Sequence, residues 1–179
     1  MSRHIALLRG INVGGRGLLS MADLRALAEG LGFTEVRTLL QSGNMVFNAA
    51  GKPAELERKL EAALKAHAGR DILVMIRTPR EWAAIIDANP MPDFAAQHPS
   101  FYQAFFMKEP LEPAALAAAL ESHEGPETFH LDGRTIYVSF PGGMSQSALM
   151  DKPLDKRIGA VTTARNWNTV LKLRDAAGA

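Results

Sequence analysis

The sequence predicts an α+β protein built from two halves, on three observations. First, apolar runs and amphipathic stretches succeed one another through Thr78 as strand, helix, strand, strand, helix, strand, which is the split βαββαβ order of a ferredoxin-like domain. Second, a proline-bearing stretch follows at 90–100. Third, the order then repeats loosely, without visible sequence repetition. We therefore expect two ferredoxin-like halves, the second incomplete and ending in helices.

The first strand and helix have clear local signals. Residues 5–8 are apolar and are bounded by charge and glycine, as in a strand buried on both faces. Ser20 and Asp23 form a variant capping box, and apolar residues at helical spacing continue to a glycine stop at Gly32. These signals predict a helix that starts after Ser20.

A hairpin is the clearest feature of the first half. Strand-like runs at 36–40 and 45–47 flank Gln41-Ser42-Gly43-Asn44, whose Gly and Asn tolerate the positive φ of a tight turn. An amphipathic helix from Pro53 to about Gly69 and a strand at 72–76 complete the pattern.

The remaining elements follow in order. Thr78 and Glu81 form a capping box around Pro79, which predicts a further helix. We expect domains at 1–89 and 101–179, joined by a Pro-rich linker at 90–100. The second domain is expected to contain strands at 101–107, 128–131 and 135–140, and helices at 113–120, 147–158 and 165–173.

Composition excludes several classes of protein. The 179 residues carry a net charge of +1, without the basic excess typical of non-specific nucleic-acid binding, so nucleic-acid binding is not expected. The absence of cysteine excludes disulfide scaffolds and thiolate metal sites and fits a reducing compartment. The apolar run near the N-terminus is too short for a signal or a membrane span, which predicts a cytoplasmic protein with no membrane partner.

Polar residues are expected to gather at one end of the first sheet. In the split arrangement the first two strands are parallel, so the loop after the first strand and the hairpin turn share that end. Arg16, in the same loop, is a further candidate cation. The ligand-binding candidates from these two segments are Arg9, Asn12, Gly14, Gly15, Gln41, Ser42 and Asn44.

The glycines of this loop match neither the P-loop nor the dinucleotide fingerprint. Their simpler role is to permit a tight loop. Ser42 lacks the GxSxG context of a hydrolase nucleophile.

A second polar stretch runs from Thr162 to Thr169. Trp167 is expected on the core face of a helix. Asparagine forms helices poorly, so the two asparagines of this stretch need another role. Arg165, Asn166 and Asn168 therefore join the candidate site as a third wall, or else cap a neighbouring element.

No histidine spacing indicates a metal site, and no metal is expected. The sequence indicates neither a cofactor nor catalytic residues, and leaves oligomeric state open. Single-stranded RNA binding is a further alternative, since RNA-recognition domains share the strand order of the first half. Their aromatic residues on the first and third strands are represented here only by Phe47.

Three motifs, Arg9 to Gly15, Gln41 to Phe47 and Arg165 to Val170, resemble those of the bacterial family catalogued as domain of unknown function 1697. The resemblance covers Arg9 to about Leu173 and implies two ferredoxin-like α+β halves. It implies no activity, cofactor or catalytic residue.

These observations predict a protein that binds a small anionic ligand, such as a nucleotide or phosphometabolite, with catalysis left open. In that hypothesis arginines hold a phosphate or carboxylate, and amide side chains fix its orientation. The alternative is an interaction or structural module, in which the same polar residues lock the fold by buried hydrogen bonds.

Overall fold

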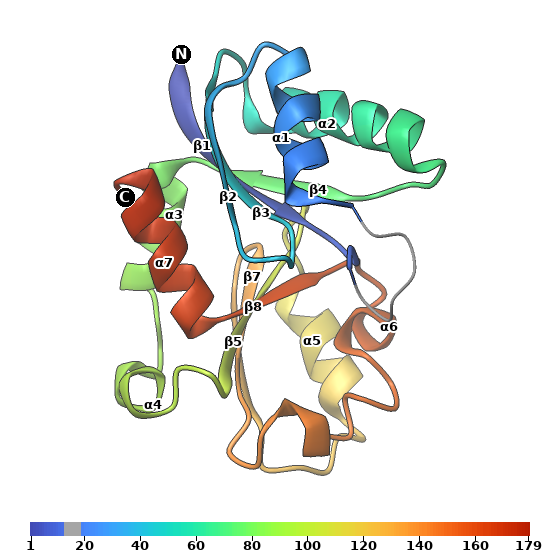
Figure 1. Ribbon diagram of the computed structural model, residues 1–179. Helices are drawn as coiled ribbons and strands as arrows, with labels where there is room; N and C mark the ends of the chain where they lie inside the picture. Colours follow the sequence, from blue (N-terminus) through green and yellow to red (C-terminus); the bar gives the residue numbers. More distant parts are fainter. Residues whose placement is uncertain (13–18) are drawn as a thin grey trace. The chain divides into compact units, whose positions relative to one another are not determined.

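A computed structural model describes residues 1–12 and 19–179 of the chain. They form two compact units, one of residues 1–84 with 172–179 and the other of residues 85–171. Each unit contains a four-stranded antiparallel sheet and helices (Figure 1). The expected α+β fold of two such halves, ending in helices, is confirmed.

The first unit has the ferredoxin-like strand order β2-β3-β1-β4. Its elements are β1 (Ser2–Leu8), α1 (Met21–Gly30), β2 (Thr34–Leu39), β3 (Asn44–Ala49), α2 (Pro53–Ala68) and β4 (Val74–Arg77), followed by the start of α3 (Pro79–Asp87).

The strand register brings three chain segments to one end of this sheet. Asn44, the first residue of β3, lies opposite Leu7 of β1 and opposite Leu39 of β2. On the other side of β1, Leu8 lies opposite Val74 of β4. The end of β1, the turn between β2 and β3 and the start of β4 therefore adjoin one another, as the split topology predicts.

Helices α1 and α2 cover one face of the first sheet and form its core with it. Leu24 of α1 and Leu60 of α2 are fully buried with Phe47 of β3, and burial of each such side chain is worth about 1.5–3 kcal/mol. The predicted caps are present. Ser20 Oγ accepts from Asp23 N at 3.0 Å, and Thr78 N donates to Glu81 Oε2 at 2.8 Å.

Two carboxylates of α2 lie on the outer edge of the first sheet. Glu61 Oε1 accepts the backbone N–H of Val74 at 2.8 Å, and Glu57 Oε1 accepts that of Ile76 at 2.7 Å. Because β4 is an edge strand, these N–H groups have no neighbouring strand to bond with. The carboxylates take the place of that strand.

The second unit has the order β6-β7-β5-β8, which repeats that of the first sheet. The fourth strand, β8, lies where the sequence indicated only the approach to a helix at 165–173. The expected linker range contains a helix, α4. The elements are α4 (Pro92–Gln97), β5 (Tyr102–Phe106), α5 (Pro113–Leu120), β6 (Thr128–Asp132), β7 (Thr135–Ser139), a 3-10 turn (Met144–Gln146), α6 (Leu154–Ile158), β8 (Thr163–Asn166) and the first part of α7 (Trp167–Ala177). The rest of α7 belongs to the first unit.

None of the helices in the described part of the chain combines the length and the apolar character that a membrane span requires.

Candidate functional site

The candidate site of the first unit is the rim of its sheet, defined as residues 9–12, which follow β1, and residues 40–44, which join β2 to β3. The two segments are joined directly, because Asn12 Nδ2 donates to the Gln41 carbonyl at 2.7 Å. The topological prediction that they meet is therefore correct. Gly14, Gly15 and Arg16 lie outside the described residues.

Asn12 uses its whole side-chain amide in the rim. Its Nδ2 also donates to the Leu19 carbonyl at 3.0 Å, while its Oδ1 accepts from Leu19 N at 2.9 Å. Its φ of 56° is in the left-handed region that asparagine tolerates better than most residues. The Asn12 side chain thus holds Asn12 and Leu19 together and joins them to Gln41 of the hairpin turn.

Asn44 has a similar internal role on the other side of the turn. It is completely buried, and its Nδ2 donates to the Leu39 carbonyl at 2.9 Å and to Ser42 Oγ at 3.0 Å. With both N–H bonds engaged inside the protein, Asn44 shapes the turn rather than presenting a donor at its surface.

Gly43 allows the turn to pack against the end of β1. Its φ is +78°, and a Cβ at this position would lie 2.6 Å from Ile11 Cδ1 and 2.8 Å from Leu8 Cβ. The Leu8 N–H donates to the Gly43 carbonyl at 2.8 Å. Both the backbone angle and the close approach therefore require glycine.

The polar side chains that the rim exposes to solvent are those of Gln41 and Ser42. Leu40 of the same turn is also exposed, and Arg9, which follows β1, is half-buried. A further cation, Arg70, is exposed, and its Nη2 donates to the Gly10 carbonyl at 3.3 Å. Arg70 was not among the residues predicted from the sequence. The signal was available, because β4 is antiparallel to β1, so the residues that precede β4 lie where β1 ends.

Arg165, in β8 of the second unit, is buried. Its Nη1 donates to Thr163 Oγ1 at 2.9 Å and to the Ala164 carbonyl at 2.7 Å. Burial lowers the pKa of its guanidinium from 12.5 to about 10, which still leaves it protonated at neutral pH. Arg165 is thus a buried cation with hydrogen bonds of its own.

Asn166 and Asn168 also make internal hydrogen bonds. Asn166 Oδ1 accepts from Thr169 N at 3.0 Å and from Thr169 Oγ1 at 2.9 Å, so it caps the N-terminus of α7. Asn168 Nδ2 donates to Ser100 Oγ at 3.1 Å. The capping role is one of the two that the sequence left open for these residues. Trp167 is buried as expected, with its ring 5.1 Å from that of Tyr102.

The structure therefore gathers Arg9, Asn12, Gln41, Ser42 and Asn44 in the first unit, and Arg165, Asn166 and Asn168 follow one another closely in the second. A single pocket that contains both groups stays a prediction.

A buried histidine lies elsewhere in the first unit. His4 of β1 is 1% exposed, its ring stacks on that of Phe47 at 5.5 Å, and neither ring nitrogen has a hydrogen-bond partner among the described residues. Burial lowers the pKa of His4, against weaker opposing effects of the Ala49 backbone and the Glu81 carboxylate. The neutral imidazole is thus the form that the core favours.

A second histidine, His123, forms a buried cluster with Glu127 and Ser147. His123 Nε2 lies 2.9 Å from Glu127 Oε2, and both side chains are about 95% buried. Burial raises the pKa of Glu127. Hydrogen bonds from Ser147, from its own backbone and from His123, together with the charge of His123, outweigh that effect and leave this pKa below its ordinary value. Because Glu127 rather than the histidine is central, the cluster is not arranged as a nucleophile with its base.

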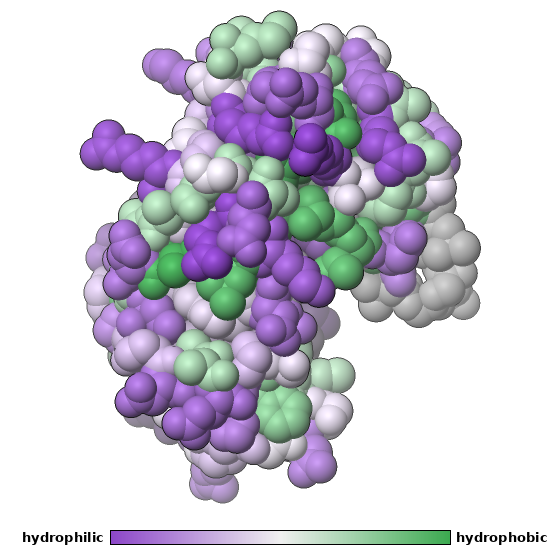
Figure 2. Space-filling view, turned by 60° about the vertical axis from the view of Figure 1, so that its left-hand side comes forward, coloured by the Kyte–Doolittle hydropathy of each residue, from purple (hydrophilic) through white to green (hydrophobic). Residues whose placement is uncertain are grey.

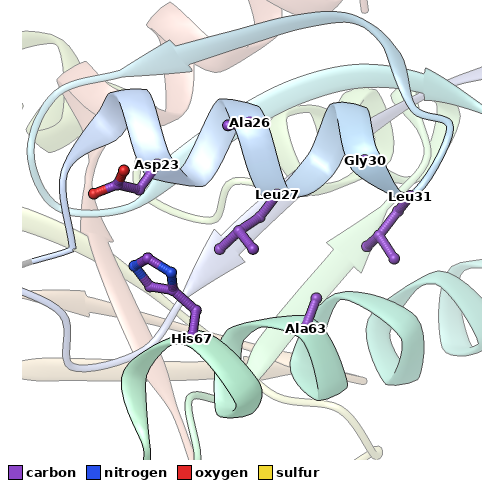
Figure 3. A pocket seen from close by; sticks show the side chains of 7 residues that line it. All are labelled: Asp23, Ala26, Leu27, Gly30, Leu31, Ala63 and His67. Atoms are coloured by element: carbon purple, nitrogen blue, oxygen red, sulfur yellow. The ribbon is translucent and has the colours of Figure 1, made fainter.

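Hollows lie on the surface of the first unit, and two of them are lined by residues that the structure describes. One, of about 410 Å³, runs between α1 and α2 with mostly small and apolar walls and with Asp23 and His67 near one end (Figure 3). The other, of about 780 Å³, lies around the start of α3 and includes Arg3, Thr78 and Arg80. None of the eight predicted site residues that the structure describes lines either of them.

In the described part of the chain, no group of three or more histidine or acidic residues has a metal-binding arrangement.

Comparisons with known proteins place the chain beside others whose function is not established. The family model described as "Protein of unknown function (DUF1697)" matches residues 1–137. Among solved structures, the chain is similar to the conserved bacterial protein SP0830 from Streptococcus pneumoniae, with 25% sequence identity, a TM-score of 0.77 and coverage of 97% of each chain. The comparison with curated proteins finds no match.

Proposed function

We propose, for a chain that belongs to the DUF1697 family of proteins of unknown function, that it binds a small anionic ligand at the rim of the first sheet. The observation that carries the proposal is the Asn12 network. Its bonds to Leu19 and to the Gln41 carbonyl hold these residues together at the hairpin turn, where Gln41 and Ser42 are exposed. A polar surface held in advance in this way loses little entropy when a ligand binds.

The charges around the rim support an anion rather than a cation. Residues 9–12 and 40–44 contain no carboxylate, and Arg9 and Arg70 contribute positive charge there. Asp71, which follows Arg70, is paired with Lys65 at 2.9 Å. Guanidinium groups bind phosphate and carboxylate through paired, charge-assisted hydrogen bonds, and Gln41 and Ser42 supply groups that orient the rest of the ligand.

The proposal is limited to binding, because no rim residue carries a side chain suited to a general base. It assigns ligand contacts to the first unit. The internal bonds of Asn166 and Asn168 favour a stabilising role for those two residues. A cytoplasmic location belongs to the same proposal and rests on the cysteine-free composition.

Calorimetric titration of the full chain with inorganic phosphate, ribose 5-phosphate, adenosine monophosphate and citrate tests this proposal. We expect saturable binding to at least one of them, weakened about tenfold by Arg9→Gln or Arg70→Gln, since a hydrogen bond to a charged group is worth about 1.5–3 kcal/mol. Arg58→Gln, on an exposed position of α2, is the control for simple loss of charge. Absence of heat across the panel, or an equal effect of all three substitutions, refutes the site.

A second candidate is a structural or interaction module without a ligand, and a specific observation favours it. Asn12, Asn44, Asn166 and Asn168 all engage their amides inside the protein. This alternative predicts no binding to the panel together with a marked loss of stability when these residues are replaced. Retention of a labelled single-stranded RNA at low salt would instead favour the RNA-binding alternative.

A further inference from the structure

The turn between β2 and β3 displays a large apolar side chain in an uncommon backbone conformation. Leu40 has a φ of 60° and is 50% exposed. The left-handed region is costly for a residue with a Cβ, and leucine, unlike asparagine, has no polar group that could offset the cost by a local hydrogen bond. Such outliers persist only where surrounding contacts enforce them.

The contacts that enforce it are two asparagine amides, one on each side. Asn44 Nδ2 donates to the carbonyl of Leu39, which precedes Leu40, at 2.9 Å. Asn12 Nδ2 donates to the carbonyl of Gln41, which follows it, at 2.7 Å. Asn44 therefore holds the peptide group that directly precedes Leu40, and Asn12 holds the peptide group between Gln41 and Ser42. The turn that presents the leucine at the rim is thus fixed at two points by side chains from different segments.

Leu40 is also chemically unlike its surroundings. The other exposed side chains of the rim are the polar Gln41 and Ser42, and Ile11, the remaining large apolar residue of residues 9–12, is 2% exposed. The face of the molecule shown in Figure 2 is mainly hydrophilic, with a few hydrophobic residues between. A half-exposed leucine in this turn offers an apolar contact at the same end of the sheet where Arg9 follows β1 and Arg70 bonds to the Gly10 carbonyl.

We propose that Leu40 packs against an apolar, flat part of the ligand, so that the substrate class of the rim is an anion that also carries an aromatic or similarly apolar group. The inference rests on the proposed anion site and restricts the class of ligand that it would bind. A free inorganic anion has no apolar group that Leu40 could contact. An aromatic group that covers the exposed half of this side chain should bind about tenfold more tightly than its anion alone, the scale expected for burial of part of a leucine.

The test compares 1-naphthyl phosphate with inorganic phosphate by calorimetry on the full chain. We expect the naphthyl ester to bind about tenfold more tightly. Leu40→Asn should reduce this preference to about twofold, because asparagine accepts a positive φ but offers no apolar surface. Leu40→Met should retain the preference. Val161→Asn, at another apolar position that is 43% exposed, is the matched control and should behave as the unchanged protein.

The outcomes separate the two proposals. If phosphate binds and is weakened by Arg9→Gln, but the naphthyl ester shows no advantage or Leu40→Asn leaves its advantage intact, the role of Leu40 is refuted and the anion site stands. An equal loss in Val161→Asn also refutes it, because the apolar contact is then not local. If neither compound binds, the anion site itself is refuted, and the role of Leu40 with it. A melting curve of Leu40→Asn shows whether the variant is folded.

Discussion

Replacement of Gly43 by alanine tests the packing of the rim most directly. The new Cβ would lie 2.6 Å from Ile11 Cδ1 and 2.8 Å from Leu8 Cβ, too close for either atom to remain in place. Leu8 is fully buried in β1, so the turn would have to move away. Overpacking of this kind costs about 1–3 kcal/mol, and the positive φ adds about 1 kcal/mol for a residue with a Cβ. We expect a total of about 2–4 kcal/mol.

The matched control is Gly69→Ala. Gly69 ends α2 with a φ of +67° and has open space around it, so alanine there incurs only the backbone cost of about 1 kcal/mol. For a chain of this length, the melting temperature should fall by about 4–16 °C in Gly43→Ala and by about 2–4 °C in the control. Differential scanning calorimetry measures both. Equal decreases would refute the close approach of the turn to β1.

Three further predictions concern stability. Asn166→Ala should lower stability by about 1 kcal/mol through loss of the α7 cap, whereas Asn166→Ser should restore most of it; equal melting temperatures of the alanine variant and the unchanged protein would contradict the capping role. Because burial holds the pKa of His4 below 6.5, the folded state takes up its proton less readily than the unfolded state, so stability is lost as pH falls below 6.5. His4→Phe should reduce that loss in urea titrations at about pH 7.5 and about pH 5.5, and an unchanged loss would show that other groups cause it. The pKa of Glu127 lies below 4.5, so its contribution is complete above 4.5 and disappears as pH falls through the lower value of the folded state. Glu127→Gln should therefore cost about 1–3 kcal/mol near neutral pH and much less at about pH 3, and a constant difference would contradict this.

Much of the fold was predictable because local signals, such as capping and turn residues, indicate the same elements that long-range strand pairing stabilises. The capping residues Ser20 and Thr78 mark helix starts that the structure reproduces, and the turn at 41–44 joins the two strands expected around it. Strand β8 was not predictable in the same way. Its four residues, Thr163–Asn166, are largely polar, and they form a strand because β5 offers a free edge to pair with. Tertiary pairing of this kind overrides local propensity.

The site was predicted less completely, since residue type does not reveal whether a polar group already has a partner. Asn12 and Gln41 share the rim because topology places them there. The amides of Asn12 and Asn44 are both engaged internally because backbone carbonyls accept from them. The directions of those carbonyls cannot be predicted from the sequence. Leu40 illustrates the opposite case. The sequence gives no indication that a leucine in a turn has a special role. Only its φ of 60° and its exposure in the structure distinguish it.

The hydrogen bonds between β4 and the two glutamates of α2 affect how this protein can associate with other chains. An extended peptide that paired with β4 would add a strand to the first sheet. It would first have to displace Glu57 and Glu61 from the N–H groups of Ile76 and Val74, and both carboxylates would then need water or another partner. Strand addition at that border is therefore disfavoured. A helix that covers a sheet can in this way also limit its lateral growth, and two side chains are enough to do so.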